Sequence, residues 1–524
     1  MQLAQSTFTQ ACKEITQNLY EINNITSTLA RQEIKRVCAK YSLTRIPRNH
    51  EILSQADPDA YESLRTVLIK KPIKTASGVA VVAVMPQPFA CPHGRCTYCP
   101  GGAEINTPNS YTGKEPVTIN AIEHMYDPIK QITSKIDRLI SCGHNVAKLE
   151  IVIVGGTFLF MPKDYQEHFI KSCYDALNGF ISITLNDAKI NNEHANIRCV
   201  GFTIETKPDY CKQTHVNSML EFGITRIEIG VQCLQERVYK IINRGHTYKD
   251  VVESFQVAKD SGYKLVAHMM PGLPTMSPKD DIADFDKLFS DELLKPDMLK
   301  IYPSLVLKDT PLYSDYTSGK YTPYSDDAMI NVLATIKSKI PKWVRIMRIQ
   351  REISQDEIIA GPTRGNLRQL IHQELRRNNK SCKCIRCREI GLQKTDISDI
   401  TLNNIQYASS GGTETFLSCD DSQDRIYGFL RLRKPSKKTA RPEINKDSCL
   451  VRELHVYGTS LQLDMHNKGV QHSGIGKTLL SEAEKIAVEQ FDSKRLMIIS
   501  AVGTRLYYKK LGYSLRGPYM EKIL

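Results

Sequence analysis

ACPHGRCTYCP, the stretch at residues 90–100, carries three cysteines in the spacing Cys-x4-Cys-x2-Cys. Cys91, Cys96 and Cys99 directly follow an apolar run at residues 78–85, which has the composition of a β-strand. Three thiolates on one short loop can hold three irons of a 4Fe–4S cluster and leave the fourth iron open. We therefore predict a metal centre on a loop that follows the first strand of an α/β domain.

An open iron has a specific chemical use. It can chelate S-adenosylmethionine (SAM) through its amino and carboxylate groups, and one electron from the cluster then cleaves SAM to a 5′-deoxyadenosyl radical. A zinc knuckle is the alternative for these cysteines, and His93 could serve as its fourth ligand. Gly155 and Gly156 favour the SAM interpretation over an ordinary turn, because glycines at the end of the next strand let the backbone approach a ligand closely.

Strand-like runs alternate with helical patterns between residues 76 and 345, which predicts a parallel, partly closed (βα)6 barrel. The six runs are at residues 79–84, 149–154, 198–203, 226–230, 264–269 and 298–302. In such barrels the chemistry sits at the C-terminal ends of the strands. Glu205 stands at such an end and is a candidate cofactor-binding residue, with a salt bridge at the barrel rim as the alternative.

The chain divides into four predicted segments. They are a helical, basic N-terminal segment at residues 1–75, the barrel at 76–345, a basic zinc-binding linker at 346–400 and an α/β domain at 401–524. The 524 residues, with 41% hydrophobic and 24% charged residues, are typical of a soluble multidomain protein. No signal peptide is expected, and six of the 15 cysteines fall in two tight clusters. This pattern indicates a reducing compartment, and we expect a cytoplasmic protein.

The net charge of +13 is concentrated in the linker. Residues 361–388 hold eight basic residues against the single acid Glu374. The basic residues are Arg364, Arg368, Arg376, Arg377, Lys380, Lys383, Arg386 and Arg388. A solvated face is one interpretation, and a phosphate-binding surface whose affinity falls steeply with salt is the other.

The linker also carries the second cysteine cluster. Cys382, Cys384 and Cys387 offer three thiolates, whereas tetrahedral zinc in a closed structural site needs four ligands. His372 is our candidate for the fourth ligand, and free surface thiols are the alternative interpretation. We expect a structural zinc ion that holds the linker between the barrel and the C-terminal domain.

A glycine-rich loop near the C-terminus indicates a nucleotide cofactor. The run QHSGIGK at residues 471–477 precedes an amphipathic helix at 478–488, so backbone N–H groups and the positive helix end can face a pyrophosphate. A nucleotide-binding loop of another kind is the alternative. The β-like run at 450–457 and the run YYKKLGY at 507–513 complete an order that resembles GNAT acetyltransferases, which bind acetyl-CoA between two splayed strands.

The likeness to GNAT enzymes implies which residues contact acetyl-CoA. They are Glu453, Leu454, His455, Val456, Gln471, Gly474, Ile475, Gly476 and a tyrosine of the pair Tyr507 and Tyr508. Tyr508 could place its hydroxyl beside the thioester, so both tyrosines are candidate catalytic residues. Core packing is the alternative for each of them.

Seven runs of the sequence together match one known family. They are at residues 74–79, 91–102, 110–116, 155–158, 203–211, 243–247 and 300–303. From about residue 70 to the C-terminus, the chain resembles the family of Elongator catalytic subunits. The likeness implies a radical SAM barrel, a zinc-bearing linker and a GNAT-type domain that together modify wobble uridine in tRNA. The gap between the first two cysteines is shorter than in eukaryotic members and similar to archaeal and bacterial ones, which implies action without partner subunits.

The likeness also implies one reaction that both domains share. The 5′-deoxyadenosyl radical would take hydrogen from the acetyl methyl group, and the carbon radical would add to position 5 of uracil to give, after thioester hydrolysis, 5-carboxymethyluridine. The basic segments would hold the anticodon stem-loop, whose unpaired bases can be splayed into a pocket. Two alternatives stay open: a protein lysine acetyltransferase with a structural radical SAM domain and Glu453 as general base, and a non-catalytic tRNA-binding subunit. The sequence leaves a homodimer open.

Overall fold

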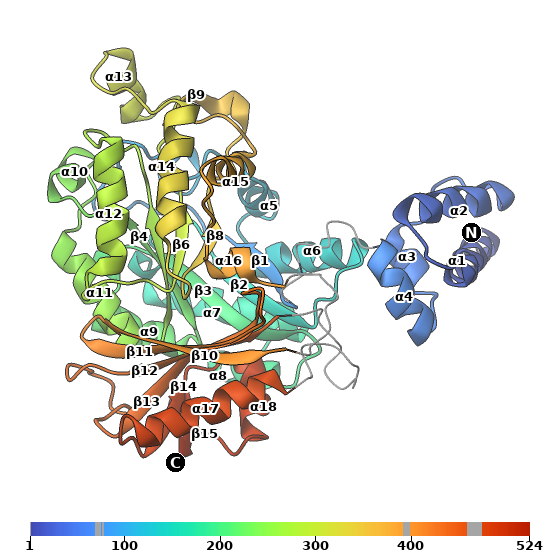
Figure 1. The fold of residues 1–524 in the computed structure, drawn as a ribbon. Coiled ribbons are helices and arrows are strands. Elements are labelled where there is room, and N and C mark those ends of the chain that lie inside the picture. Colours follow the sequence, from blue (N-terminus) through green and yellow to red (C-terminus); the bar gives the residue numbers. More distant parts are fainter. Residues whose placement is uncertain (1, 69–74, 76–77, 391–398, 458–473) are drawn as a thin grey trace.

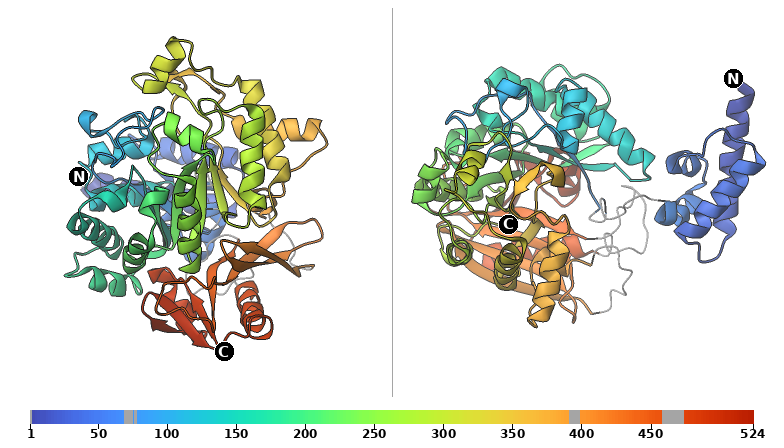
Figure 2. Two further views of the ribbon diagram at one scale, coloured as in Figure 1. Left: turned by 90° about the vertical axis from the view of Figure 1, so that its left-hand side faces the viewer. Right: turned by 90° about the horizontal axis from the view of Figure 1, so that it is seen from above.

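The computed structural model describes residues 2–68, 75, 78–390, 399–457 and 474–524. Its N-terminal helices are α1 (Gln2–Glu21), α2 (Ser27–Lys40), α3 (Asn49–Leu53) and α4 (Pro58–Leu68). Their apolar faces meet in a core of their own, which includes Ile15, Leu19, Val37 and Leu64. Figure 2 shows these helices, in blue, standing beside the rest of the molecule. Among the described residues, no helix is long and apolar enough to cross a membrane.

Seven parallel strands follow one another in chain order and form an open barrel (Figure 1). They are β1 (Ala80–Val84), β2 (Lys148–Ile153), β3 (Arg198–Thr206), β4 (Arg226–Gln232), β5 (Lys264–Met269), β6 (Met298–Ile301) and β8 (Arg345–Arg348). β1 and β8 are the two edges of this sheet. The predicted partial barrel is confirmed, with one strand more than the six expected. The sequence does not predict β8, because its four residues, Arg-Ile-Met-Arg, carry arginine at both ends.

Helices connect these strands and cover the outside of the barrel. They are α5 (Pro116–Glu123), α6 (Pro128–Ser141), α7 (Lys163–Asn178), α8 (Leu185–Asn192), α9 (Gln213–Glu221), α10 (Glu236–Ile241), α11 (Tyr248–Asp260), α12 (Pro278–Ser290), α13 (Pro311–Thr317) and α14 (Asp326–Lys339). Thr247 and Ser277 form capping boxes that fix where α11 and α12 begin. The short strands β7 (Val306–Leu307) and β9 (Ile358–Ala360) pair beside the barrel. Because the helices lie outside the sheet, the strand residues that point inward line the interior of the barrel.

The linker and the C-terminal domain follow β8. The linker contains α15 (Leu367–Arg377) and α16 (Ile385–Arg388). The domain is built from β10 (Thr401–Ser409), β11 (Gly412–Asp420), β12 (Ile426–Lys434), β13 (Ser448–Val456), α17 (Ile475–Glu489), β14 (Arg495–Ile498), α18 (Arg505–Lys509), β15 (Ser514–Arg516) and β16 (Tyr519–Ile523). β13 pairs with β14 in parallel only as far as Val451, and its remaining residues diverge from β14. This is the splayed pair that the predicted GNAT-type fold requires.

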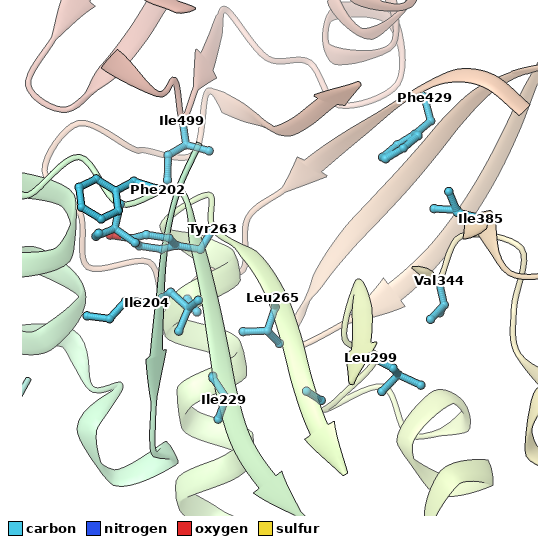
Figure 3. Packing of buried hydrophobic residues seen from close by; sticks show 14 of the residues in the cluster. Phe202, Ile204, Ile229, Tyr263, Leu265, Leu299, Val344, Ile385, Phe429 and Ile499 are labelled. Atoms are coloured by element: carbon cyan, nitrogen blue, oxygen red, sulfur yellow. The ribbon is translucent and has the colours of Figure 1, made fainter. Parts of the chain in front are cut away.

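The C-terminal sheet packs against the end of the barrel opposite the cysteine loop. One apolar core runs through both domains, and Figure 3 shows Phe202 and Tyr263 of the barrel beside Ile499 of the C-terminal domain. Farther along the same interface, Leu299 and Val344 lie on the barrel side. This continuous core fixes how the two domains sit on each other.

Buried ion pairs cross the same interface. Asp297, just before β6, accepts two hydrogen bonds from Arg452 of β13, at 2.5 and 2.7 Å. Arg452 also pairs with Glu414 at 2.7 Å, and Arg433 joins Glu414 to Asp260 at the end of α11. All of these side chains are almost completely buried. Asp297 and Asp260 of the barrel therefore depend on arginines of the C-terminal domain for charge compensation.

Candidate active site

The three cysteines of the first loop line one cavity at the C-terminal end of the barrel. Cys96 and Cys99 are each only 5% exposed, and Cys91 is half-buried. Neighbouring groups donate hydrogen bonds to two of the sulfurs: Asn109 Nδ2 to Cys91 Sγ at 3.2 Å, and the Ser110 N–H to Cys99 Sγ at 3.0 Å. N–H donors aimed at sulfur stabilise thiolates, which are the form that binds iron. The donor set therefore fits a cluster held by these cysteines.

Cys96 receives its hydrogen bonds from two cationic or imidazole groups. Arg244 Nη1 lies 3.7 Å from Cys96 Sγ, and its Nη2 donates to the Gly230 carbonyl at 2.7 Å. His93 Nε2 lies 3.2 Å from the same sulfur. Arg244 is 7% exposed, so its charge is poorly screened by solvent. A positive charge at this position favours a negatively charged ligand set.

The hydrogen bonds of His93 argue against its service as a zinc ligand. Lys207 Nζ lies 3.0 Å from His93 Nδ1, and an ammonium group can only donate. Nδ1 therefore accepts, and the proton of the neutral ring sits on Nε2, facing Cys96. Burial, together with the cations of Lys207 and Arg244, lowers the pKa of His93 to about 4, so the ring is neutral at pH 7. This arrangement disfavours the zinc-knuckle alternative.

The cavity below the cysteines has a volume of about 370 Å³. Gly156 and Glu205, both predicted to bind a cofactor, line it together with the cysteines. Gly155 adopts φ +108° and packs against Met85 and Pro108, so a side chain there would crowd the loop. The structure thus brings the predicted residues of the first three strands together around one space.

A charged cluster inside this cavity was not among the predicted site residues. His268 Nε2 lies 2.9 Å from Glu228 Oε2, and Lys300 pairs with both Glu228 and Glu205. Burial opposes ionisation of Glu228, but Lys300, His268 and Arg226 hold its pKa well below the usual range. Glu228 is therefore a carboxylate, although it is only 1% exposed. The sequence carries a signal for the cluster: Glu228, His268 and Lys300 each stand singly between apolar residues of a strand, as in Ile-Glu-Ile of β4.

Several polar atoms in the cavity wall have no hydrogen-bond partner among the described residues. They include Gln232 Oε1 and Tyr98 Oη, whereas Glu228 Oε1 and Arg226 Nε make no hydrogen bond but face each other as an ion pair at 3.7 Å. A buried polar atom without a partner costs free energy, about 1–3 kcal/mol each, unless a ligand or water pairs with it. Gln232 and Tyr98 therefore indicate a cavity that suits a polar ligand, as SAM is.

The second cysteine cluster is compact. One ligand atom from each of Cys382, Cys384 and Cys387 lies within 4.8 Å of the others. His372 Nε2, on α15, lies 3.8 Å from Cys387 Sγ, but it is not within 4.8 Å of all three sulfurs. The three thiolates fit a zinc site beside α16, and His372 stays the candidate for its fourth ligand.

The residues expected to contact acetyl-CoA fall into two groups. Val456, with Leu454 two residues before it on the same side of β13, faces α17, where Gly476 lies beside the hydroxyl of Tyr507. Glu453 faces the barrel and pairs with Arg431 Nε at 2.9 Å. Glu453 thus lies on the face of β13 that is turned away from α17, which does not favour the lysine acetyltransferase alternative.

The remaining predicted residues of this domain differ in their surroundings. Gly474 is the N-cap of α17 and Ile475 is its first residue, so both stand at the helix end that favours a pyrophosphate. His455 points toward the barrel side and contacts the Tyr457 ring, with 4.5 Å between the ring centroids. Tyr508 is 7% exposed and packs between Tyr507 and Tyr513. Gln471 lies outside the described residues.

Comparisons with known proteins cover nearly the whole chain. The Radical SAM superfamily matches residues 88–288, the Radical_SAM C-terminal domain residues 296–377, and the ELP3 N-terminal domain residues 8–76. Elongator complex protein 3 of Schizosaccharomyces pombe is 44% identical over 98% of both chains. The human protein of the same name is 43% identical over 93% of this chain and 92% of its own. The solved structure of archaeal Methanocaldococcus infernus Elp3, lacking residues 1–46, matches with TM-score 0.76 and 39% identity, over 86% of this chain and all of that one.

Proposed function

Because the chain belongs to the Elongator complex protein 3 family and carries its radical SAM domain, we propose that it converts the wobble uridine of tRNA to 5-carboxymethyluridine. One observation carries the proposal most directly. The three cysteines, with N–H groups aimed at their sulfurs, open onto a cavity whose buried polar atoms lack partners. That is the arrangement a cluster and SAM require.

The chain's own residues have distinct tasks in this proposal. A cluster held by Cys91, Cys96 and Cys99 would supply the electron that cleaves SAM to a 5′-deoxyadenosyl radical. The Gly156 loop and Glu205 bind and orient the polar groups of SAM. Buried walls of the cavity exclude water, so a reactive species formed inside is protected from side reactions.

The aromatic part of the cavity wall suits a nucleobase. Tyr111 and Tyr302 line the cavity together with Met347, and stacking of a base on an aromatic ring contributes about 1–3 kcal/mol. The cavity also extends down the barrel to Glu150 and Arg226, toward the end against which the C-terminal sheet packs. This supports a reaction in which the acetyl donor of one domain meets the radical of the other.

Incubation of an anticodon stem-loop RNA with the cluster-containing protein, reductant, SAM and acetyl-CoA labelled with carbon-13 in the acetyl group tests the proposal. We expect nucleoside mass spectrometry to find labelled 5-carboxymethyluridine, and none when acetyl-CoA is left out. Formation of 5′-deoxyadenosine without any modified uridine would contradict the proposed substrate while leaving the radical chemistry intact. Protein acetylation without either product would favour the lysine acetyltransferase.

We further propose that zinc occupies the second cysteine cluster as a structural ion. Cys384→Ser removes the most buried of the three thiolates, and a closed structural site with one ligand lost binds zinc far more weakly. We expect the variant to be purified without zinc, measured by elemental analysis. The control is Cys419→Ser, which alters a buried cysteine of β11 that is not a member of the cluster. Full zinc content in Cys384→Ser would contradict this assignment.

A further inference from the structure

A second groove opens beside the cavity of the cysteine loop. Its volume is about 600 Å³, and its walls come from the end of β8 and from the linker helices. Four arginines line it, namely Arg348, Arg368, Arg376 and Arg386, together with neutral groups such as Asn366 and Gln369. No carboxylate is among the described residues that line this groove. The groove is therefore a local concentration of positive charge within the basic linker.

Three of the lining residues stand on one face of α15. Arg368, His372 and Arg376 are spaced four residues apart, which places them one above another on a helix. Arg377, the next residue, does not line the groove, and its side chain is 79% exposed beside Glu374. Arg376 and Arg377 are neighbours with the same charge in the sequence, but only Arg376 lines the groove.

The four guanidinium groups differ in how far the protein neutralises them. Arg348 pairs with Glu352 at 3.0 Å, and Arg386 lies 3.5 Å from Glu389. Arg368 reaches only backbone carbonyl groups, at 3.4 Å. The Arg376 side chain has no hydrogen bond or ion pair to any described residue.

The unpaired charges on α15 would have to be balanced by an anion from outside. Guanidinium groups are the preferred partners of phosphate, which they bind in a bidentate fork. A repeated anion, such as a phosphodiester chain, can satisfy several of these groups at once. Because the described lining residues include no carboxylate, the groove does not suit a cationic ligand.

The groove adjoins the cavity of the cysteine loop. Met347 and Arg348 line both of them, so the end of β8 is a wall that the two spaces share. A nucleotide whose base enters the cavity past Met347 has its sugar and phosphates outside, where the groove begins. His372, the candidate fourth zinc ligand, ties the arginine face of α15 to the cysteine cluster.

We propose that this groove binds the phosphodiester backbone that flanks the nucleotide held in the cavity. The inference rests on the proposed function and deepens it, because it assigns the polyanion to one face of α15 and not to the basic linker as a whole. Arg376 is a binding residue in this view, and Arg377 is not.

The test measures binding of a fluorescent anticodon stem-loop RNA to the full-length protein over a series of salt concentrations. Arg376→Gln is expected to weaken binding several-fold at low salt and to reduce the slope of log affinity against log salt by about 0.7 to 1, as for one lost phosphate contact. Arg377→Gln is the matched control, with the same charge change one residue away, and its affinity and slope are expected to stay those of the unaltered protein. Zinc content and circular dichroism check that both variants are folded.

The outcomes separate the groove from the proposed function. If the unaltered protein binds no RNA, the proposed function itself is overturned. If it binds RNA and Arg376→Gln matches Arg377→Gln in affinity and slope, the groove assignment is overturned and the proposed function stands. If Arg376→Gln loses affinity for the RNA and Arg377→Gln does not, the result supports both the groove assignment and the proposed function.

Discussion

Cys96→Ser is expected to reduce 5′-deoxyadenosine formation from SAM to the background of a reaction without protein. With one of three thiolates gone, the loop can no longer hold three irons of a cluster, and a serine hydroxyl does not replace the thiolate at neutral pH. The variant should also lose most of its iron and its brown absorbance after anaerobic reconstitution. Liquid chromatography of the nucleoside product, together with iron analysis, measures both effects.

The matched control for this variant is Cys142→Ser. Cys142 caps α6 at its C-terminal end, is part-exposed, and does not line the cavity. The Cys142→Ser variant should keep its iron and should still form 5′-deoxyadenosine. A Cys96→Ser protein that retains both would mean that Cys96 is not an iron ligand, and the assignment of the loop would be wrong. Thermal unfolding without metal shows whether the two variants fold equally well.

Much of the barrel could be predicted because apolar residues dominate its strands, with a polar residue only singly or at the ends. The predicted run at 264–269 coincides with β5, and the run at 226–230 covers most of β4. β8 was not predicted, because its two apolar residues stand between arginines at both ends of the strand. Its place is set by pairing with β6 and by packing of Ile346 in the core, which are tertiary effects that no local pattern carries.

The candidate site divides in the same way. The cysteines, Gly156 and Glu205 could be predicted, because motif spacing and strand ends are properties of the sequence. The contact of Arg244 with Cys96 could not, because the two residues are 148 positions apart and meet only when β1 and β4 lie in one barrel. The contact between Lys207 and His93 is of the same kind. The positive charges near the cysteines, which favour a negatively charged ligand set, are thus known only from the fold.

Asp297→Ala is expected to destabilise the protein by about 3–5 kcal/mol, the usual cost of breaking a buried ion pair by removing one partner. Asp297 is completely buried and accepts both hydrogen bonds of the Arg452 fork, and Arg431 lies 3.7 Å away. Without the carboxylate, Arg452 keeps Glu414 and the Tyr263 carbonyl as partners, but the charges of Arg452 and Arg431 lose the carboxylate that they share. A marked shift of the urea unfolding midpoint to lower concentration measures the loss.

Asp286→Ala is the control for this change, because it removes the same group from an exposed pair. Asp286 binds Lys339 at 2.6 Å, but both side chains are about half exposed, so solvent screens the pair and little stability is lost. Equal unfolding midpoints for the two variants would mean that the buried network contributes no more than a surface pair. The loss of Asp297 should also affect activity. Asp297 belongs to the barrel and Arg452 to the C-terminal sheet, so loss of their pair weakens the contact between the two domains. A reaction that needs both domains should then slow more than SAM cleavage alone, which uses only the barrel.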